Sequence, residues 1–190
     1  MCSSDLMART VPQFASWRED ADRAVLYAGE NIGPYGSGEQ HRGYQVVELV
    51  GDYQTFLSTG GIASTAHDLA LYQLASMNYH HSTLNLSGNA LRHMQSMQHG
   101  FGDSGWGYGL GYWVMPTEHG FAVGHSGGLP GVSTYSLMVP EELTGAVVLT
   151  NRSDIKAMGL AEALLNDLRG ALWRTQLQDP LPIEIGRAHV

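Results

Sequence analysis

The chain has 190 residues and a formal net charge of −8, from 18 acidic and 10 basic residues. Hydrophobic residues make up 43% and charged residues 15%, which is typical of a packed globular domain and argues against a disordered chain. The acidic balance disfavours a nucleic-acid partner, which needs clustered Lys and Arg, and no apolar run approaches the ~20 residues of a membrane span.

The two ends of the chain can be encoded by complementary DNA sequences. Met1–Asp5 can be encoded by a DNA sequence that uses GTG as the start codon. The reverse complement of that DNA sequence can encode Ile185–His189. The pair resembles the stem of a sequencing-library adapter, although codon degeneracy leaves coincidence as the alternative. We therefore expect residues 1–6 and 185–190 to be adapter-derived and residues 7–184 to form a single incomplete domain of a longer protein. Under this expectation Cys2 and His189 have no functional role.

The first half of the chain predicts a loop followed by two helices. Residues 7–52 are polar and rich in turn residues, so we expect a long loop with at most short elements. Ser64 or Thr65 caps a helix that runs to about Met77, with Asp68 in its first turn. We expect this helix to be mostly buried. The positions that predict this burial are Ala66, Leu69, Ala70, Leu71, Gln73, Leu74, Ala75 and Met77.

A second helix and a glycine-rich strand follow. Ser87 caps the helix, and Leu91, Met94 and Met97 recur on one side of it, a spacing typical of core packing. Residues 105–112 then alternate glycine with large side chains. This period of two predicts a strand whose glycine face allows another backbone to approach closely.

The C-terminal part predicts three further strands and a last helix. The strands are Phe121–His125, Val132–Val139 and Ala146–Thr150. We expect the first two to be joined at Gly127–Gly131 and the second pair by Pro140–Gly145, and such short connections force antiparallel pairing. The last helix spans Lys156 to Trp173, with an apolar stripe of Leu160, Leu164, Leu168 and Leu172. The predicted fold class is α+β, an antiparallel sheet with packed helices.

Two motif matches have the wrong context for the chemistry they suggest. Gly100–Gly105 spells GxGxxG, but it follows a helix and belongs to no βαβ unit, which disfavours a dinucleotide site. The histidines at positions 80, 81, 93 and 99 lack the ligand spacing of a zinc site. We therefore expect no cofactor and no metal.

A third match, Gly124–Gly128, reads GHSGG, the pattern of the α/β-hydrolase nucleophile elbow. That elbow needs a helix directly after the serine and a histidine later in the chain. Here a strand is predicted after Ser126, and His189 is the only later histidine. The elbow remains an alternative within the hydrolases.

Three segments together resemble another family. Gly60–Ala70, GGIASTAHDLA, is similar to the GG-x-x-STA-x-DLA segment of the serine β-lactamase-like family. This family includes penicillin-binding DD-peptidases, class C β-lactamases, and related esterases and D-amino-acid peptidases. His125-Ser126-Gly127 resembles its third motif, Lys/His-Thr/Ser-Gly, and Tyr108–Tyr112 resembles the preceding strand. The resemblance runs from about Gly60 to Leu172 and implies the C-terminal portion of a β-lactamase/transpeptidase-like fold.

The resemblance also implies roles for four residues. His125 would supply a hydrogen-bond donor or a positive charge opposite the nucleophile, and Ser126 a hydroxyl for the substrate carboxylate or a proton relay. Gly127 would keep the strand bare, and the Gly128 N–H would be one of two oxyanion donors, each worth about 3–4 kcal/mol. The alternative for His125 is a strand histidine whose hydrogen bonds are satisfied by a neighbour.

Two further motifs of the family are absent from their expected place. Its S-x-x-K nucleophile motif and its Y/S-x-N motif lie upstream of the GG-x-x-STA segment, where this sequence has neither. Ser153–Lys156 spells SxxK, but it follows the HSG strand, and its serine and aspartate fit the cap of the last helix. Ser76–Asn78 and Ser87–Asn89 spell SxN but also lie downstream.

These observations favour one interpretation over two others. The chain is interpreted as an inactive fragment of a serine acyl hydrolase that acts on a small-molecule, peptide or ester substrate. The alternatives are a catalytically dead binding or regulatory member of the same fold, and a complete non-enzymatic α+β domain. The bond cleaved and the oligomeric state are left open.

Overall fold

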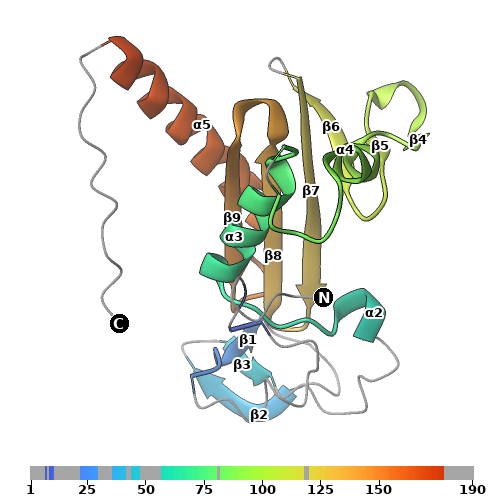
Figure 1. Cartoon of the computed structure of the whole chain (residues 1–190). Helices are drawn as coiled ribbons and strands as arrows, with labels where there is room; N and C mark the ends of the chain where they lie inside the picture. Colours follow the sequence, from blue (N-terminus) through green and yellow to red (C-terminus); the bar gives the residue numbers. More distant parts are fainter. Residues whose placement is uncertain are drawn as a thin grey trace.

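The computed structural model describes residues 7, 9–10, 22–29, 36–41, 44–47, 57–80, 82–117 and 120–177. Its main feature is an antiparallel six-stranded sheet in the order β4-β5-β6-β7-β8-β9 (Figure 1). The strands are β4 His99–Gly100, β5 Gly107–Tyr108, β6 Trp113–Thr117, β7 Gly120–Leu129, β8 Val132–Val139 and β9 Thr144–Thr150. The helices are α2 Leu57–Gly60, α3 Ala66–Met77, α4 Gly88–Gln95 and α5 Ala157–Leu177, with 3-10 turns η3 Gly102–Ser104 and η4 Pro140–Glu142. The predicted α+β class with an antiparallel sheet is confirmed.

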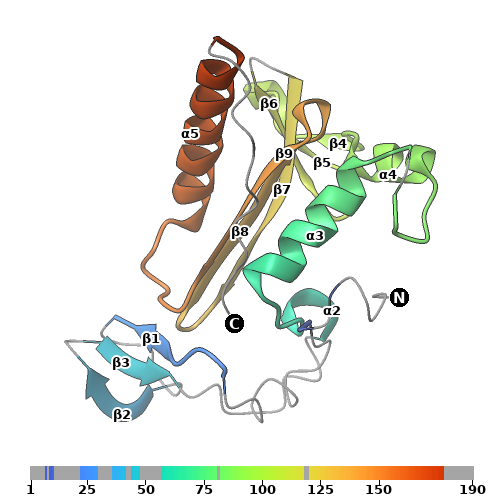
Figure 2. The same cartoon turned by 60° about the vertical axis from the view of Figure 1, so that its left-hand side comes forward.

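Helix α5 covers one face of this sheet, and α3 lies on the other (Figure 2). The residues of α5 that enter the core are Ala157, Ala161 and Leu165, which pack with Tyr135 and Leu137 of β8. The leucine stripe lies outside this core: Leu160, Leu164 and Leu168 are 48%, 52% and 39% exposed. The small alanines on the inner face allow α5 to lie close to the strands. The leucines are next to these positions in sequence, about a quarter of a helical turn around the axis, and therefore point outward. The side chain of Leu172 is outside the described part.

Helix α3 begins as predicted, because the Thr65 side chain accepts a hydrogen bond from the Asp68 N–H. Its predicted burial is only partly correct, since Ala66, Ala70 and Leu74 are exposed. The predicted burial of Gln73 is confirmed, and its amide donates to Ser136 Oγ at 2.9 Å and to the Leu137 carbonyl at 3.1 Å. The sequence predicted the buried position but not these hydrogen bonds to β8.

Helix α4 is capped by Ser87, whose hydroxyl accepts from the Ala90 N–H. Of its predicted apolar side, Leu91 is buried and Met94 is partly buried, whereas Met97 is 38% exposed. The buried neighbours of Met94 are Met77, Tyr112, Val114, Val123 and Met138.

The strand predicted over residues 105–112 is wrong in extent. Only Gly107–Tyr108 is a strand, because Gly105 and Gly111 adopt positive φ values of 71° and 85° and turn the chain. Strand β6, which begins at Trp113, was missed. The expected close approach is confirmed at two glycines: a Cβ on Gly107 or Gly109 would come within 3.0 Å of a backbone carbonyl oxygen.

The β7–β8 hairpin differs from the prediction in one respect that matters for function. Strand β7 does not end at His125 but continues to Leu129, and only Pro130 and Gly131 form the turn. Gly131 has φ 77°, which suits a tight hairpin turn. Strand β8 has the predicted bounds, and β9 begins at Thr144, two residues earlier than predicted. The whole HSGG segment therefore lies on a strand.

Residues 7–52, predicted as loop with short elements, contain a small antiparallel sheet in the order β1-β3-β2. Its strands are β1 Leu26–Ala28, β2 Gly36–His41 and β3 Tyr44–Val47. The Tyr27 N–H donates to the Asn151 carbonyl at 2.8 Å, which attaches this sheet beyond the end of β9. Such short strands leave little periodicity, so the sheet itself was missed.

Two further expectations concern the ends of the chain and membrane-spanning helices. Residues 1–6 and 185–190, including Cys2 and His189, are outside the described ranges. Over those ranges, no helix combines the length and the hydrophobicity that a membrane crossing requires.

Candidate active site

The surroundings of β7 change at its midpoint. Residues 120–124 pair with β6 on one side, ending at Trp113↔Gly124, while residues 123–129 pair with β8 on the other. Ala122, Val123 and Gly124 are buried, and the next four residues, His125 to Gly128, are exposed. In the described part of the chain, the HSGG segment thus has one paired edge and one open edge.

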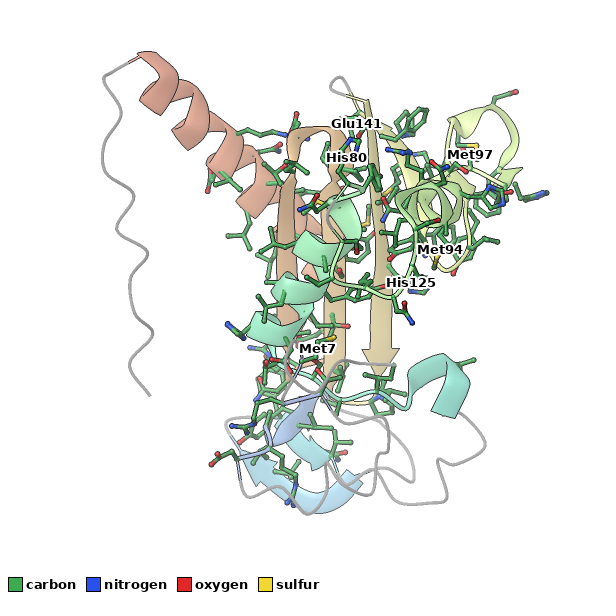
Figure 3. All side chains as sticks on the ribbon, in the orientation of Figure 1. Met7, His80, Met94, Met97, His125 and Glu141 are labelled. Carbon is green, nitrogen blue, oxygen red and sulfur yellow. The ribbon has the colours of Figure 1, made fainter. Side chains whose placement is uncertain are left out.

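Both ring nitrogens of His125 have hydrogen-bond partners. Nδ1 lies 2.6 Å from the Ser126 carbonyl oxygen, and Nε2 lies 2.8 Å from the Tyr108 hydroxyl. Because a carbonyl oxygen can only accept, Nδ1 carries the proton, and in the neutral ring Nε2 then accepts from Tyr108. His125 is exposed beside β7 (Figure 3). The expected donor or positive charge at this position stays a prediction.

Two aromatic rings flank the imidazole. The centroid of the His125 ring lies 5.9 Å from that of Tyr108 and 6.4 Å from that of Trp113. Tyr108 and Trp113 also pack edge to face with centroids 5.2 Å apart. Sequence reasoning placed Tyr108 in a neighbouring strand but missed its bond to His125, because a contact between distant segments leaves no local signal.

The backbone of the open edge presents hydrogen-bonding groups. The Ser126 carbonyl faces this edge, where the His125 ring reaches it. Backbone groups alternate sides along a strand, so the Gly128 N–H points to the same edge, away from β8. A Cβ on Gly128 would meet nothing closer than 4.0 Å. Gly128 is therefore an exposed residue with open space beside its Cα, and its N–H faces no partner strand among the described residues.

Gly127 has a different reason to be glycine. A Cβ there would come within 3.0 Å of Thr134 Oγ1 on the paired strand β8. Ser126 is exposed, and no described residue forms a hydrogen bond with its hydroxyl. Strand β7 continues for three residues after Ser126 and then turns into β8, so the strand–serine–helix geometry of a nucleophile elbow is absent.

The GG-x-x-STA-x-DLA segment forms the start of α3 and does not reach His125. The Asp68 carboxylate is buried and accepts from the Arg9 N–H at 2.8 Å and from Thr10 Oγ1 at 2.9 Å. Burial raises the pKa of Asp68, but the hydrogen bonds from Thr10 and Arg9 outweigh burial and hold this pKa below its usual value. Ser64 Oγ also lies 2.7 Å from Thr10 Oγ1. The segment thus fastens an N-terminal stretch to the helix.

The SxxK match at Ser153–Lys156 has a structural role that differs from the expected cap. Asp154 accepts from Arg152 Nε at 3.0 Å rather than from the end of α5, and the hydrogen bond from Arg152 lowers the pKa of Asp154. Arg152 Cζ also lies 4.1 Å from the centroid of the Tyr44 ring, which links β3 to the end of β9. Ser153 and Lys156 are exposed.

The other motif matches also have local structural explanations. Ser76 is buried and donates to the Gln73 carbonyl, and Ser87 caps α4. Gly100–Gly105 forms the end of β4 and the turn η3, with no helix after it. No group of three or more potential metal ligands occurs among the described residues. His81 lies outside them.

Comparisons with known proteins agree with this architecture. The sequence model of the β-lactamase family matches residues 8–169. An octameric penicillin-binding protein homologue from Pyrococcus abyssi is similar with a TM-score of 0.68 and 22% identity, over 88% of this chain and 36% of that one. A D-stereospecific amidohydrolase from a Streptomyces species is similar with a TM-score of 0.60 and 17% identity, over 80% of this chain and 42% of that one.

A class C β-lactamase is similar with a TM-score of 0.54 and 16% identity, over 73% of this chain and 42% of that one. No curated protein matches the chain. The chain therefore spans less than half the length of each of these three solved structures. Because the family match extends over most of the sequence, the chain belongs to the β-lactamase family.

Proposed function

We propose that this chain is the C-terminal part of a serine acyl hydrolase, of the peptidase, esterase or β-lactamase-related kind, and that the open edge of β7 forms one wall of its active site. One observation carries the proposal. The HSGG half of β7 is exposed and, within the described part of the chain, pairs with β8 alone, while Tyr108 donates or accepts a hydrogen bond at its histidine. A strand edge of this kind can pair with an extended ligand.

The geometry supports a division of roles along this edge. The Gly128 N–H would donate to the oxyanion that forms when a serine oxygen attacks the substrate carbonyl. Attack forms an ester with the serine and expels an alcohol or amine, which takes up a proton. Water then hydrolyses the ester. His125 would orient the substrate or tune proton transfer, and the Ser126 hydroxyl would bind a substrate carboxylate or relay a proton.

The nucleophile is proposed to come from a segment that this chain does not contain. No S-x-x-K motif occurs before Gly60, and the exposed Ser153 and Lys156 belong to the region between β9 and α5. An exposed lysine stays protonated at neutral pH, and an unactivated serine hydroxyl is a poor nucleophile. The same missing motif favours a second candidate function, that of a catalytically dead binding or regulatory protein. Sequencing the coding DNA upstream of residue 7 distinguishes the enzyme from the dead protein, because only an enzyme requires S-x-x-K there.

Acyl-adduct formation tests the proposal on the chain itself. The 190-residue protein is incubated with a fluorophosphonate, a chromogenic penicillin analogue and a short-chain p-nitrophenyl ester, and its intact mass is measured. We expect no adduct with any of the three. A stoichiometric adduct that disappears in Ser126→Ala or in Ser153→Ala would place the nucleophile in this chain and overturn the proposal.

A further inference from the structure

Five aromatic rings form a continuous row that starts at His125. Tyr108 and Trp113 contact the imidazole, as described above, and the row continues from Trp113 to Phe101 with centroids 5.5 Å apart. It ends at His99, whose ring packs edge to face on Phe101 at 5.6 Å. The row crosses from β7 over β6 and β5 to β4 and the residue that follows it. We refer to these five residues as the aromatic row.

The aromatic row faces solvent in the described part of the chain. His99 and His125 are exposed, Phe101 is 42% exposed, and Tyr108 and Trp113 are half-buried. Single exposed apolar side chains are common on proteins, but a contiguous exposed group is informative because it marks a surface that binds something.

The local backbone holds the aromatic row in place. The Phe101 N–H donates to the Trp106 carbonyl at 2.8 Å, and the Phe101 carbonyl accepts from Ser104 Oγ at 2.8 Å. His99 pairs with Tyr108 across β4 and β5, and Tyr108 pairs with Trp113 across β5 and β6. A ligand therefore finds the rings already arranged, which reduces the entropy lost on binding.

We propose that the aromatic row is a subsite for an aromatic or bulky apolar group of the substrate. This inference rests on the proposed function, because it takes the open edge of β7 as the place where the reacting carbonyl lies. The row begins at His125, the first residue of that edge, so a substrate bound at Gly128 and extended toward His125 reaches Tyr108 and Trp113 next. Because three residues of extended strand, about 10 Å, separate Gly128 from His125, the preferred substrates are then esters or amides that carry a phenyl-sized group about that far from the scissile bond. Offset and edge-on ring contacts give such a group its affinity.

Binding to the chain as it stands tests the subsite without any catalytic step. ¹⁵N-labelled protein is titrated with N-benzylacetamide and, separately, with N-methylacetamide, which has the same amide but no phenyl ring. We expect N-benzylacetamide to shift the amide signals of residues 99–113 and 124–128, and N-methylacetamide to leave them unchanged at the same concentration. Phe101→Ala should weaken N-benzylacetamide binding about fivefold.

Phe121→Ala is the matched control. Phe121 is a phenylalanine of similar exposure, 48%, on β7 but outside the aromatic row. Its removal should change the affinity less than twofold. Equal effects of the two alanine variants, or shifts that map away from the row, would overturn the subsite. Acylation is measured separately on the longer protein, so failure of acylation with intact N-benzylacetamide binding would refute the proposed function and leave the subsite standing.

Discussion

The two halves of β7 have opposite environments within one strand. Residues 120–124 all pair with β6, and Val123 and Gly124 pair with β8 as well and are buried, whereas among the described residues His125–Gly128 pair only with β8 and are exposed. Both halves contain glycine, but for different reasons. A Cβ on Gly124 would come within 3.0 Å of the Ser136 carbonyl oxygen, while one on Gly128 would meet open space.

This difference shows how a strand held in a sheet can expose backbone hydrogen-bonding groups to a ligand. At Val123 and Gly124 both edges of the strand are paired, so their backbone groups are not available to a ligand. From His125 to Gly128 only the β8 edge is paired among the described residues, which leaves the outer N–H and C=O groups without a partner strand there. Substitutions should therefore affect stability in the first half and function in the second.

Gly124→Ala should give the largest effect on folding. The added methyl group meets backbone atoms of β8 that cannot move without disturbing the sheet, so we expect a loss of about 3 kcal/mol in the free energy of unfolding. Gly128→Ala, the matched variant in the open half, should change this free energy by no more than about 0.5 kcal/mol. Urea denaturation of both variants checks the pair. Equal losses would contradict the contrast between the two halves.

Gln73→Ala should be nearly as damaging. Its amide is buried and donates to Ser136 Oγ and the Leu137 carbonyl on the strand behind His125. Removing the amide leaves both acceptors without this donor and creates a cavity, so we expect the free energy of unfolding to fall by about 2–3 kcal/mol. Gln98→Ala, an exposed glutamine after α4, is the control and should be close to neutral in the same urea experiment. A neutral Gln73→Ala would show that α3 is held by other contacts.

Asp68 should make stability depend on acid pH. Its pKa is lower in the folded protein than in the unfolded chain, so the unfolded state binds more protons between the two values. The stabilisation is thus fully present above the unfolded value and is lost as the pH falls through the folded value. Asp68→Asn should have a shallower loss of unfolding free energy than wild type as the pH is lowered from 6 toward 2. Parallel curves would contradict the role given to the Thr10 and Arg9 hydrogen bonds.

Tyr108→Phe should have the smallest effect on folding and a specific effect on His125. It keeps the ring contacts and removes only the hydroxyl bonded to Nε2, so the free energy of unfolding should fall by about 1 kcal/mol at most. In ¹⁵N-histidine-labelled protein, the Nε2 signal of His125 should move downfield while Nδ1 stays protonated. Tyr79→Phe removes a hydroxyl bonded to Gln95 and should leave the His125 signals unchanged. An unchanged Nε2 signal in Tyr108→Phe would refute the hydrogen bond.

The parts of this fold that the sequence could predict are those with local causes. Thr65 and Ser87 cap the helices as expected, and β8 has the predicted bounds, because caps and alternating side chains act over a few residues. The exposure of Leu160, Leu164 and Leu168 could not be predicted locally, because the close fit of Ala157 and Ala161 depends on the distance between α5 and the sheet.

The candidate site divides in the same way. His125 and Gly128 could be selected from a short motif, but the extension of β7 through that motif depends on pairing with β8. The partners of His125 come from β5 and β6, which are distant in sequence, and the strand β6 itself was missed. The sequence can show where the motif lies in the chain. Which side chains surround it is decided by the pairing of strands that are distant in sequence.

The central claim is that the open half of β7 serves acyl transfer and contributes little to folding. His125→Ala in the longer protein, with its upstream sequence restored, tests this most directly through kcat/KM and the thermal midpoint measured on the same preparation. We predict a fall of about 10²-fold in kcat/KM, the scale of a group that orients substrate or tunes proton transfer, with a nearly unchanged midpoint because the side chain is exposed. A lowered midpoint with unchanged kcat/KM would contradict the account and make His125 a structural residue.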